Sequence, residues 1–61
     1  MIANFYKITN DLKTKILLTS KNIECVPHRR DPVLFHGQYF RVFKVVFDIE
    51  TCEYNIYLSR L

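Results

Sequence analysis

The sequence predicts a small all-β domain in which five short strands form a partly open barrel. Segments rich in β-branched and aromatic residues alternate along the chain with short polar turn segments, and residues of these types favour strands. The chain has 61 residues, so we expect a single domain, residues 1–61, with a modest core. We expect the sheet to curl because closure removes exposed strand edges.

The C-terminal half carries the clearest strands. Residues 32–35 and 39–48 are expected to form two strands, joined by a turn at residues 36–38 that contains the only glycine. After a second turn, residues 53–60 alternate cleanly between apolar and polar. The alternation places Tyr54, Ile56 and Leu58 on one face and Asn55, Tyr57 and Ser59 on the other.

The long strand at residues 39–48 breaks the alternation part-way along. Phe40 and Val42 share one parity, whereas Val45 and Phe47 share the other. A β-bulge near residues 43–44 would place all four apolar side chains on the same face. The sequence therefore predicts a bulge at this position.

The N-terminal half fits more than one interpretation. Residues 4–8 are expected to form a strand, and residues 9–11 fit either a turn or a helix N-cap. A short helix near residues 10–19 is the alternative to a second strand, which the β-branched residues of this segment favour. The strand would point Leu12, Ile16 and Leu18 inward and Lys13 and Lys15 outward. A long connection at residues 20–32, with both prolines, would lead to the C-terminal strands.

Composition narrows the class of protein. Nine Lys and Arg against six Asp and Glu give a net charge of +3, which suits a nucleic acid or an acidic protein as partner without requiring either. Polar residues follow Met1 too early for a signal peptide. Apolar runs such as residues 16–18 are too short to cross a bilayer. We therefore expect a cytoplasmic protein with no membrane partner.

Residues that could carry chemistry are few. Cys25 and His28, with His36 and Cys52, make a possible Cys2His2 zinc set, but only one pair is closely spaced. The simpler interpretation is two buried, reduced thiols and two loop histidines, with no metal or cofactor. Cys25 beside His28 lacks a predictable orienting acid for nucleophilic catalysis. One glycine cannot build a phosphate-binding loop, so we expect no enzyme.

Two kinds of binding fit the remaining pattern. Aromatic residues beside basic ones in a small barrel are typical of nucleic-acid binding, although most of these aromatics are also needed in the core. Open strand edges and surplus aromatics such as Tyr6 or Phe5 instead suit protein binding, or a homodimer through a strand edge. For either partner the candidate site residues are Arg29, Arg30, Arg41, Lys44, Tyr57 and Arg60.

A family resemblance bears on this choice. The carrying residues are Val26-Pro27, Arg30-Asp31-Pro32-Val33, His36 to Val42, Val45, Phe47-Asp48 and Ile56-Tyr57-Leu58. Across residues 26–58 the chain resembles small phage and prophage accessory proteins with SH3-like barrels, although Arg30 stands where that pattern often has glycine. The resemblance implies an SH3-like fold and a binding role, and it transfers no catalytic residue. The expected function is a non-enzymatic phage-type factor that binds and modulates, by inhibition, a host protein in the host cytoplasm. Nucleic-acid binding through a basic and aromatic face is the alternative.

Overall fold

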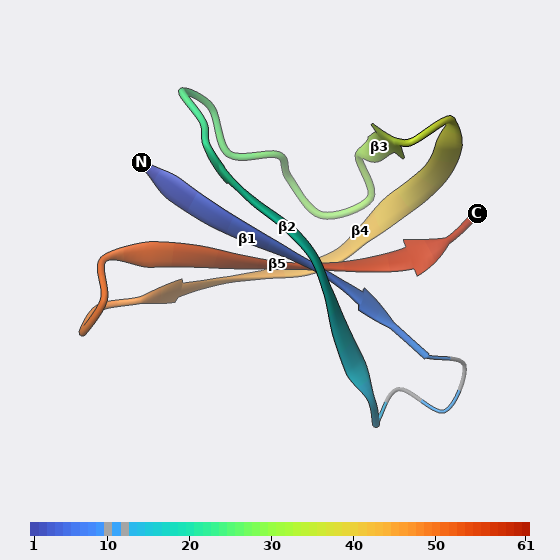
Figure 1. The fold of residues 1–61 in the computed structure, drawn as a ribbon, viewed down its shortest axis with the longest axis horizontal. Helices are drawn as coiled ribbons and strands as arrows, with labels where there is room; N and C mark the ends of the chain where they lie inside the picture. The colour runs from blue at the N-terminus through green and yellow to red at the C-terminus, as the bar shows by residue number, and fades with distance from the viewer. Residues whose placement is uncertain (10, 12) are drawn as a thin grey trace.

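The computed structural model describes residues 1–9, 11 and 13–61, and these form one five-stranded sheet (Figure 1). The order of the strands across the sheet is β2-β1-β5-β4-β3. The described residues contain no helix, and so the short helix considered near residues 10–19 is replaced by a strand. The strands are β1 (Ile2–Ile8), β2 (Lys15–Asn22), β3 (Pro32–Phe35), β4 (Gln38–Asp48) and β5 (Glu53–Arg60).

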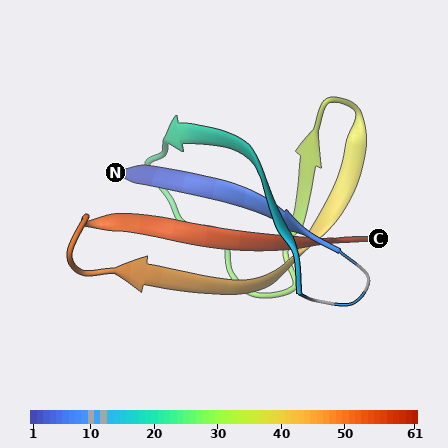
Figure 2. The same ribbon diagram turned by 60° about the horizontal axis from the view of Figure 1, so that its bottom comes forward.

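The first and last strands lie side by side at the centre of the sheet. β1 and β5 pair in parallel, whereas every other neighbouring pair is antiparallel. The sheet is strongly twisted and curled, as Figure 2 shows. β2 and β3 end the strand order and do not pair with each other. The result is a half-barrel, in agreement with the small, partly open, SH3-like barrel expected from the sequence.

The predicted bulge in β4 is confirmed. Val42 pairs with Leu58 and Lys44 pairs with Tyr57, which leaves Phe43 as an extra residue. The shift keeps Val45 in register with the inward-facing residues of β5 after the bulge. A second irregularity, between β1 and β2, leaves Leu18 without a directly opposed partner.

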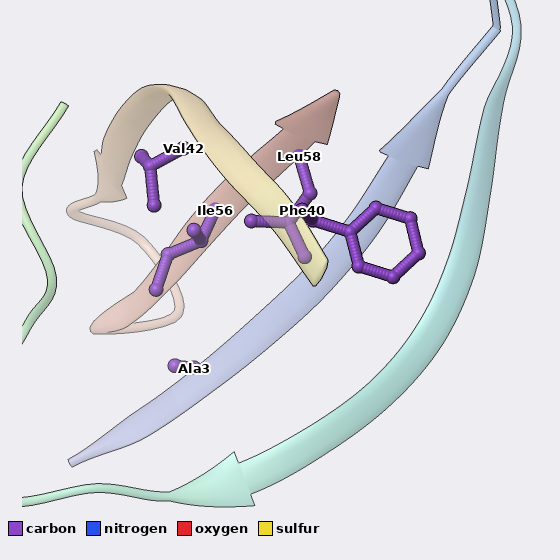
Figure 3. Packing of buried hydrophobic residues seen from close by; sticks show 5 residues of the cluster. All are labelled: Ala3, Phe40, Val42, Ile56 and Leu58. Atoms are coloured by element: carbon purple, nitrogen blue, oxygen red, sulfur yellow. The ribbon is translucent and has the colours of Figure 1, made fainter. Parts of the chain in front are cut away.

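The core lies on the concave face of the sheet. Its fully buried members come from three strands: Ala3 from β1, Phe40 and Val42 from β4, and Ile56 and Leu58 from β5 (Figure 3). Partly buried side chains from all five strands and from the connection after β2 surround this cluster. Leu18 packs against the core as expected, but Ile16 is 49% exposed, and so the inward position predicted for Ile16 is wrong. Leu12 lies outside the described residues, as does Asn10 of the predicted turn.

The β1–β2 connection contains a local hydrogen-bond network. The Thr9 N–H donates to the Thr14 carbonyl at 3.0 Å, and the Asp11 carboxylate accepts from the Thr9 hydroxyl and from the Lys13 N–H. The bond from the Thr9 hydroxyl is the main cause that lowers the pKa of the Asp11 carboxyl. The network ties together the two ends of this hairpin.

Three turns place residues in the left-handed backbone region. Gly37 has φ of 77°, as its position in the β3–β4 turn predicts. Arg30 also has φ of 77°, and this is the position at which the resembling pattern often has glycine. His36 and Cys52 occupy the same region in the turns at the two ends of β4. Within residues 1–9, 11 and 13–61 there is no helix long and apolar enough to cross a membrane.

Candidate binding surfaces

Lys44 is the centre of the residues that the sequence suggested as a site. Its side chain lines a hollow with Ile8, Lys15, Phe43 and Tyr57 on the outer, convex face of the sheet. It also lines a neighbouring hollow at the edge of β4, together with Val26, Pro27, His28 and Arg29 from the connection before β3. The bulge at Phe43 turns Lys44 to the outer face. Lys44 therefore contributes to two neighbouring hollows, one on the outer face and one beside the connection before β3.

Tyr57 forms the aromatic part of this face. Its ring stacks on that of Tyr6, with ring centroids 5.4 Å apart, because the two residues are direct partners in the parallel β1–β5 pair. The Lys15 Nζ lies 5.1 Å and the Lys44 Nζ 5.4 Å from the centre of the Tyr57 ring. Two strands on opposite sides thus direct cations toward one tyrosine, an arrangement that cation–π attraction favours.

Arg41 and Arg30 extend the cationic surface along β4. The Arg30 N–H donates to the Val42 carbonyl at 2.9 Å, and the Val42 N–H donates to the Asp31 carbonyl at 3.0 Å. These bonds hold the chain before β3 against β4. The Arg41 Nη1 lies 3.4 Å from the Arg30 carbonyl oxygen. Both arginines are exposed, and Arg41 shares the outer face with Ser59, its partner in β5.

Arg60 does not join the other five predicted site residues. It pairs with Phe40 and therefore lies on the side of the sheet that carries the core. With the Gln38 amide turned to accept, the Arg60 Nε and Nη2 both lie 2.8 Å from its oxygen. We define the basic–aromatic surface by the residues that do converge: Tyr6, Lys15, Arg29, Arg30, Arg41, Phe43, Lys44 and Tyr57.

The charges of the basic–aromatic surface are not neutralised within the described part of the chain. There, the one contact within 4.0 Å between a basic and an acidic side chain joins the His28 Nδ1 and the Asp31 Oδ2, at 3.8 Å. Three of the six acidic residues gather at the β4–β5 turn, at the other end of the β4–β5 hairpin: Asp48, Glu50 and Glu53. The acidic turn therefore lies at the opposite end of the hairpin from Arg41, and among the described residues no acidic side chain lies within 4.0 Å of the Lys44 or Arg41 cation.

A second feature lies on the other side of the sheet, where the half-barrel stays open. An apolar groove of about 240 Å³ lies between β2 and β3, and Leu58 of the core forms part of its lining. The other apolar residues of the lining come from β1, β2, β3 and the connection after β2: Phe5, Leu18, Ile23, Val33, Leu34 and Phe35. Thr19 and Lys21 of β2 complete the lining. We call this the edge groove.

The four candidate zinc ligands are not brought together. His36 and Cys52 lie in the turns at opposite ends of the 11-residue strand β4, while Cys25 and His28 lie in the connection before β3. No group of three or more His, Cys, Asp or Glu side chains that could hold a metal occurs among residues 1–9, 11 and 13–61. Both cysteines are free and exposed, and so the prediction of buried thiols is wrong. Both thiols lie in surface connections rather than in the inward positions of strands.

Sequence reasoning missed several residues of these surfaces. Lys15 and Phe43 belong to the basic–aromatic surface, but neither is among the candidate site residues expected from the sequence. The predicted bulge was itself the signal for Phe43, because the extra residue of a bulge leaves the regular alternation. No local sequence pattern predicts the edge groove, because the groove lies between β2 and β3, two strands that do not pair with each other.

Comparison with known proteins adds no neighbour: no protein-family model, curated protein or solved structure matches this chain.

Proposed function

We propose that this chain is a non-enzymatic binding protein that takes up an extended segment of a partner protein at the edge groove. One observation carries the proposal: the sheet ends at β2 and β3 without closing, and the gap between these strands is lined by apolar side chains. A strand added at either edge would form main-chain hydrogen bonds. It would place alternate side chains into the groove and cover apolar surface that the half-barrel leaves open.

The charge of β2 favours an acidic partner segment. β2 carries no acidic residue, and its Lys21 lines the groove. A second copy of the chain is less suitable. In an antiparallel pairing of β2 with itself, the Lys15 end of each strand would lie beside the Lys21 end of the other, and like charges across a strand pair are unfavourable.

The resemblance to small phage and prophage accessory proteins supports a host protein as this partner. A binding module of this kind acts by occupying a surface, and the expected consequence for the host protein is inhibition. Cys25 and His28 take no part in this function as nucleophile or base. The Asp31 carboxylate caps the local turn, where it accepts from the His28 N–H at 2.8 Å.

The test is a capture experiment with two matched variants. Immobilised protein is incubated with nuclease-treated bacterial lysate at about 150 mM ionic strength, at which weak surface electrostatics are screened. Leu34→Asp places a negative charge on the edge strand β3, at a groove-lining residue that is 57% exposed, and Ile49→Asp makes the same kind of change at an 80% exposed residue in the β4–β5 turn. We expect one retained protein, whose affinity Leu34→Asp lowers at least about tenfold and Ile49→Asp leaves unchanged.

Hydrogen exchange then locates the contact. Once the captured protein is identified and added, amide exchange should slow in β2 and β3, whose outer edges gain hydrogen-bond partners. Three outcomes would contradict the proposal: loss of all captured material after nuclease treatment, equal binding by the two variants, and protection of the outer face alone. A concentration-dependent dimer that Leu34→Asp dissolves would identify a second copy as the occupant instead.

A further inference from the structure

The basic–aromatic surface is separate from the edge groove and plays no part in the function proposed above. It lies on the outer face of the sheet and around the edge of β4, whereas the edge groove opens toward the core. Any ligand of this surface therefore binds independently of the partner strand, and the two sites can be disabled one at a time.

The cations of this surface cross the sheet in a line. Lys15 on β2 and Lys44 on β4 are separated by β1 and β5, which corresponds to about 14 Å of sheet at the usual strand spacing. Both side chains nevertheless lean over the Tyr57 ring. Arg29 continues the line beyond Lys44, because both line the hollow at the edge of β4. The line is free of ion pairs in the part of the chain that the structure describes.

The aromatic rings lie between these cations. The stacked rings of Tyr6 and Tyr57 occupy the middle of the line, and Phe43, which is 38% exposed, lines the same hollow as Lys15 and Lys44. Cation–π contacts at exposed sites are weak, so a phosphate can draw an ammonium group away from Tyr57. The vacated ring face then becomes available to a flat, aromatic group.

We propose that the basic–aromatic surface binds single-stranded nucleic acid across the strands of the sheet. Phosphates contact Lys15, Lys44, Arg29 and Arg41, and unstacked bases lie on Phe43 and Tyr57. A duplex suits this surface less, because its bases are stacked on each other and their faces cannot reach the rings. The acidic β4–β5 turn repels the phosphate backbone of the nucleic acid from that end of the sheet, and the bound nucleic acid therefore stays near Lys44.

The test measures binding of fluorescein-labelled single-stranded DNA and RNA of about 16 nucleotides by fluorescence anisotropy. With four phosphate contacts, the slope of log affinity against log salt should be about −2.8. Lys44→Ala removes one contact at an exposed residue, so it should reduce the slope by about 0.7 without affecting the fold. Lys21→Ala removes the same charge at the edge groove and should leave the slope and the affinity unchanged.

Stacking is tested separately from charge. Phe43→Ala should weaken binding by at least about fivefold while the salt slope stays the same, because no cation is lost. Circular dichroism of each variant confirms that it is folded. Leu34→Asp, which disables the edge groove, should bind the oligonucleotides as well as the wild-type protein does, so failure of one proposal is distinguishable from failure of the other.

Three results would overturn the inference. The first is an absence of binding to either oligonucleotide at about 50 mM salt. The second is equal affinity for a duplex of the same sequence, which would exclude stacking on the rings. The third is an equally tight, Lys44-dependent complex with a polyglutamate peptide, which would identify the surface as a site for acidic protein.

Discussion

The two faces of the sheet are built from the same strands but differ in almost every physical property. On the concave face Val42, Ile56 and Leu58 are at most 1% exposed, whereas their chain neighbours on the outer face are exposed, in the case of Arg41, or partly exposed, in the case of Tyr57. Alternation along a strand makes this separation possible, because successive side chains point to opposite faces. In a chain of 61 residues, one face of the sheet can therefore form the core while the other face remains available to bind a ligand.

The bulge at Phe43 is the feature on which this division depends most. Deletion of Phe43 would remove the extra residue, so either Phe40 and Val42 or Val45 and Phe47 would turn to the outer face. We expect the deletion to abolish cooperative unfolding, as measured by circular dichroism during heating. The matched variant Phe43→Ala keeps the residue count, and because Phe43 is partly exposed it should cost only about 1 kcal/mol. A deletion variant that melts like Phe43→Ala would show that the register is not fixed by the bulge.

The bulge also shows how far the sequence specifies the fold. The change of parity between Phe40-Val42 and Val45-Phe47 was sufficient to predict it, because only an extra residue places four apolar side chains together. The turn at Gly37 and the bounds of the strand at residues 53–60 were equally local signals, and the structure confirms both. Local patterns of this kind predicted the C-terminal half well.

Long-range features could not be predicted in this way. The parallel pairing of β1 with β5 leaves no trace in the periodicity of either strand, because alternation does not name a strand's partner. That pairing brings Tyr6 beside Tyr57, and the edge groove likewise follows from the strand order. Arg60 is different, since its parity within β5 already placed it with Ile56 and Leu58. This parity was sufficient to place Arg60 on the core side of the sheet, away from the other candidate site residues.

The next largest effect is the loss of stability when a side chain is truncated in the core, compared with a matched truncation on the outer face. Ile56→Ala removes a side chain that is 0% exposed, and it should cost about 2–5 kcal/mol. The total stability expected for this length is roughly 3–9 kcal/mol, so the variant should be largely unfolded by mild denaturant. Val46→Ala, at a 41% exposed residue on the outer face of β4, should cost less than about 1 kcal/mol. Urea midpoints measure both, and similar costs would mean that the outer face also stabilises the fold.

The tyrosine stack is the main stabilising contact that we expect on the outer face. A double-mutant cycle with Tyr6→Ala and Tyr57→Ala should give a coupling free energy of about 0.5–1.5 kcal/mol, which is typical of aromatic pairs. The cycle is needed because each single substitution also removes other packing. Urea unfolding of the four proteins measures the coupling. A value near zero would mean that the rings are held by the sheet rather than by each other, and that a base could separate them at little cost.

The smallest effect concerns Arg29 and Arg30 in the connection between β2 and β3. There the sign of the change in stability is more informative than its size. Arg30 has a positive φ, which costs an L-residue about 1 kcal/mol or more, whereas glycine adopts it freely but loses more entropy on folding. Arg30→Gly should therefore stabilise the protein by about 0.5 kcal/mol. Arg29 is outside the group of non-glycine residues with positive φ, so Arg29→Gly should destabilise it by about 0.5–1 kcal/mol. Both variants lose the same charge, so opposite shifts in the urea midpoint would separate backbone conformation from electrostatics. Stabilisation by both substitutions would mean instead that repulsion among the positive charges near Lys44 and Arg41 dominates, so that the basic surface destabilises the fold. Destabilisation by both would show that the positive φ of Arg30 costs less than the entropy that glycine loses on folding.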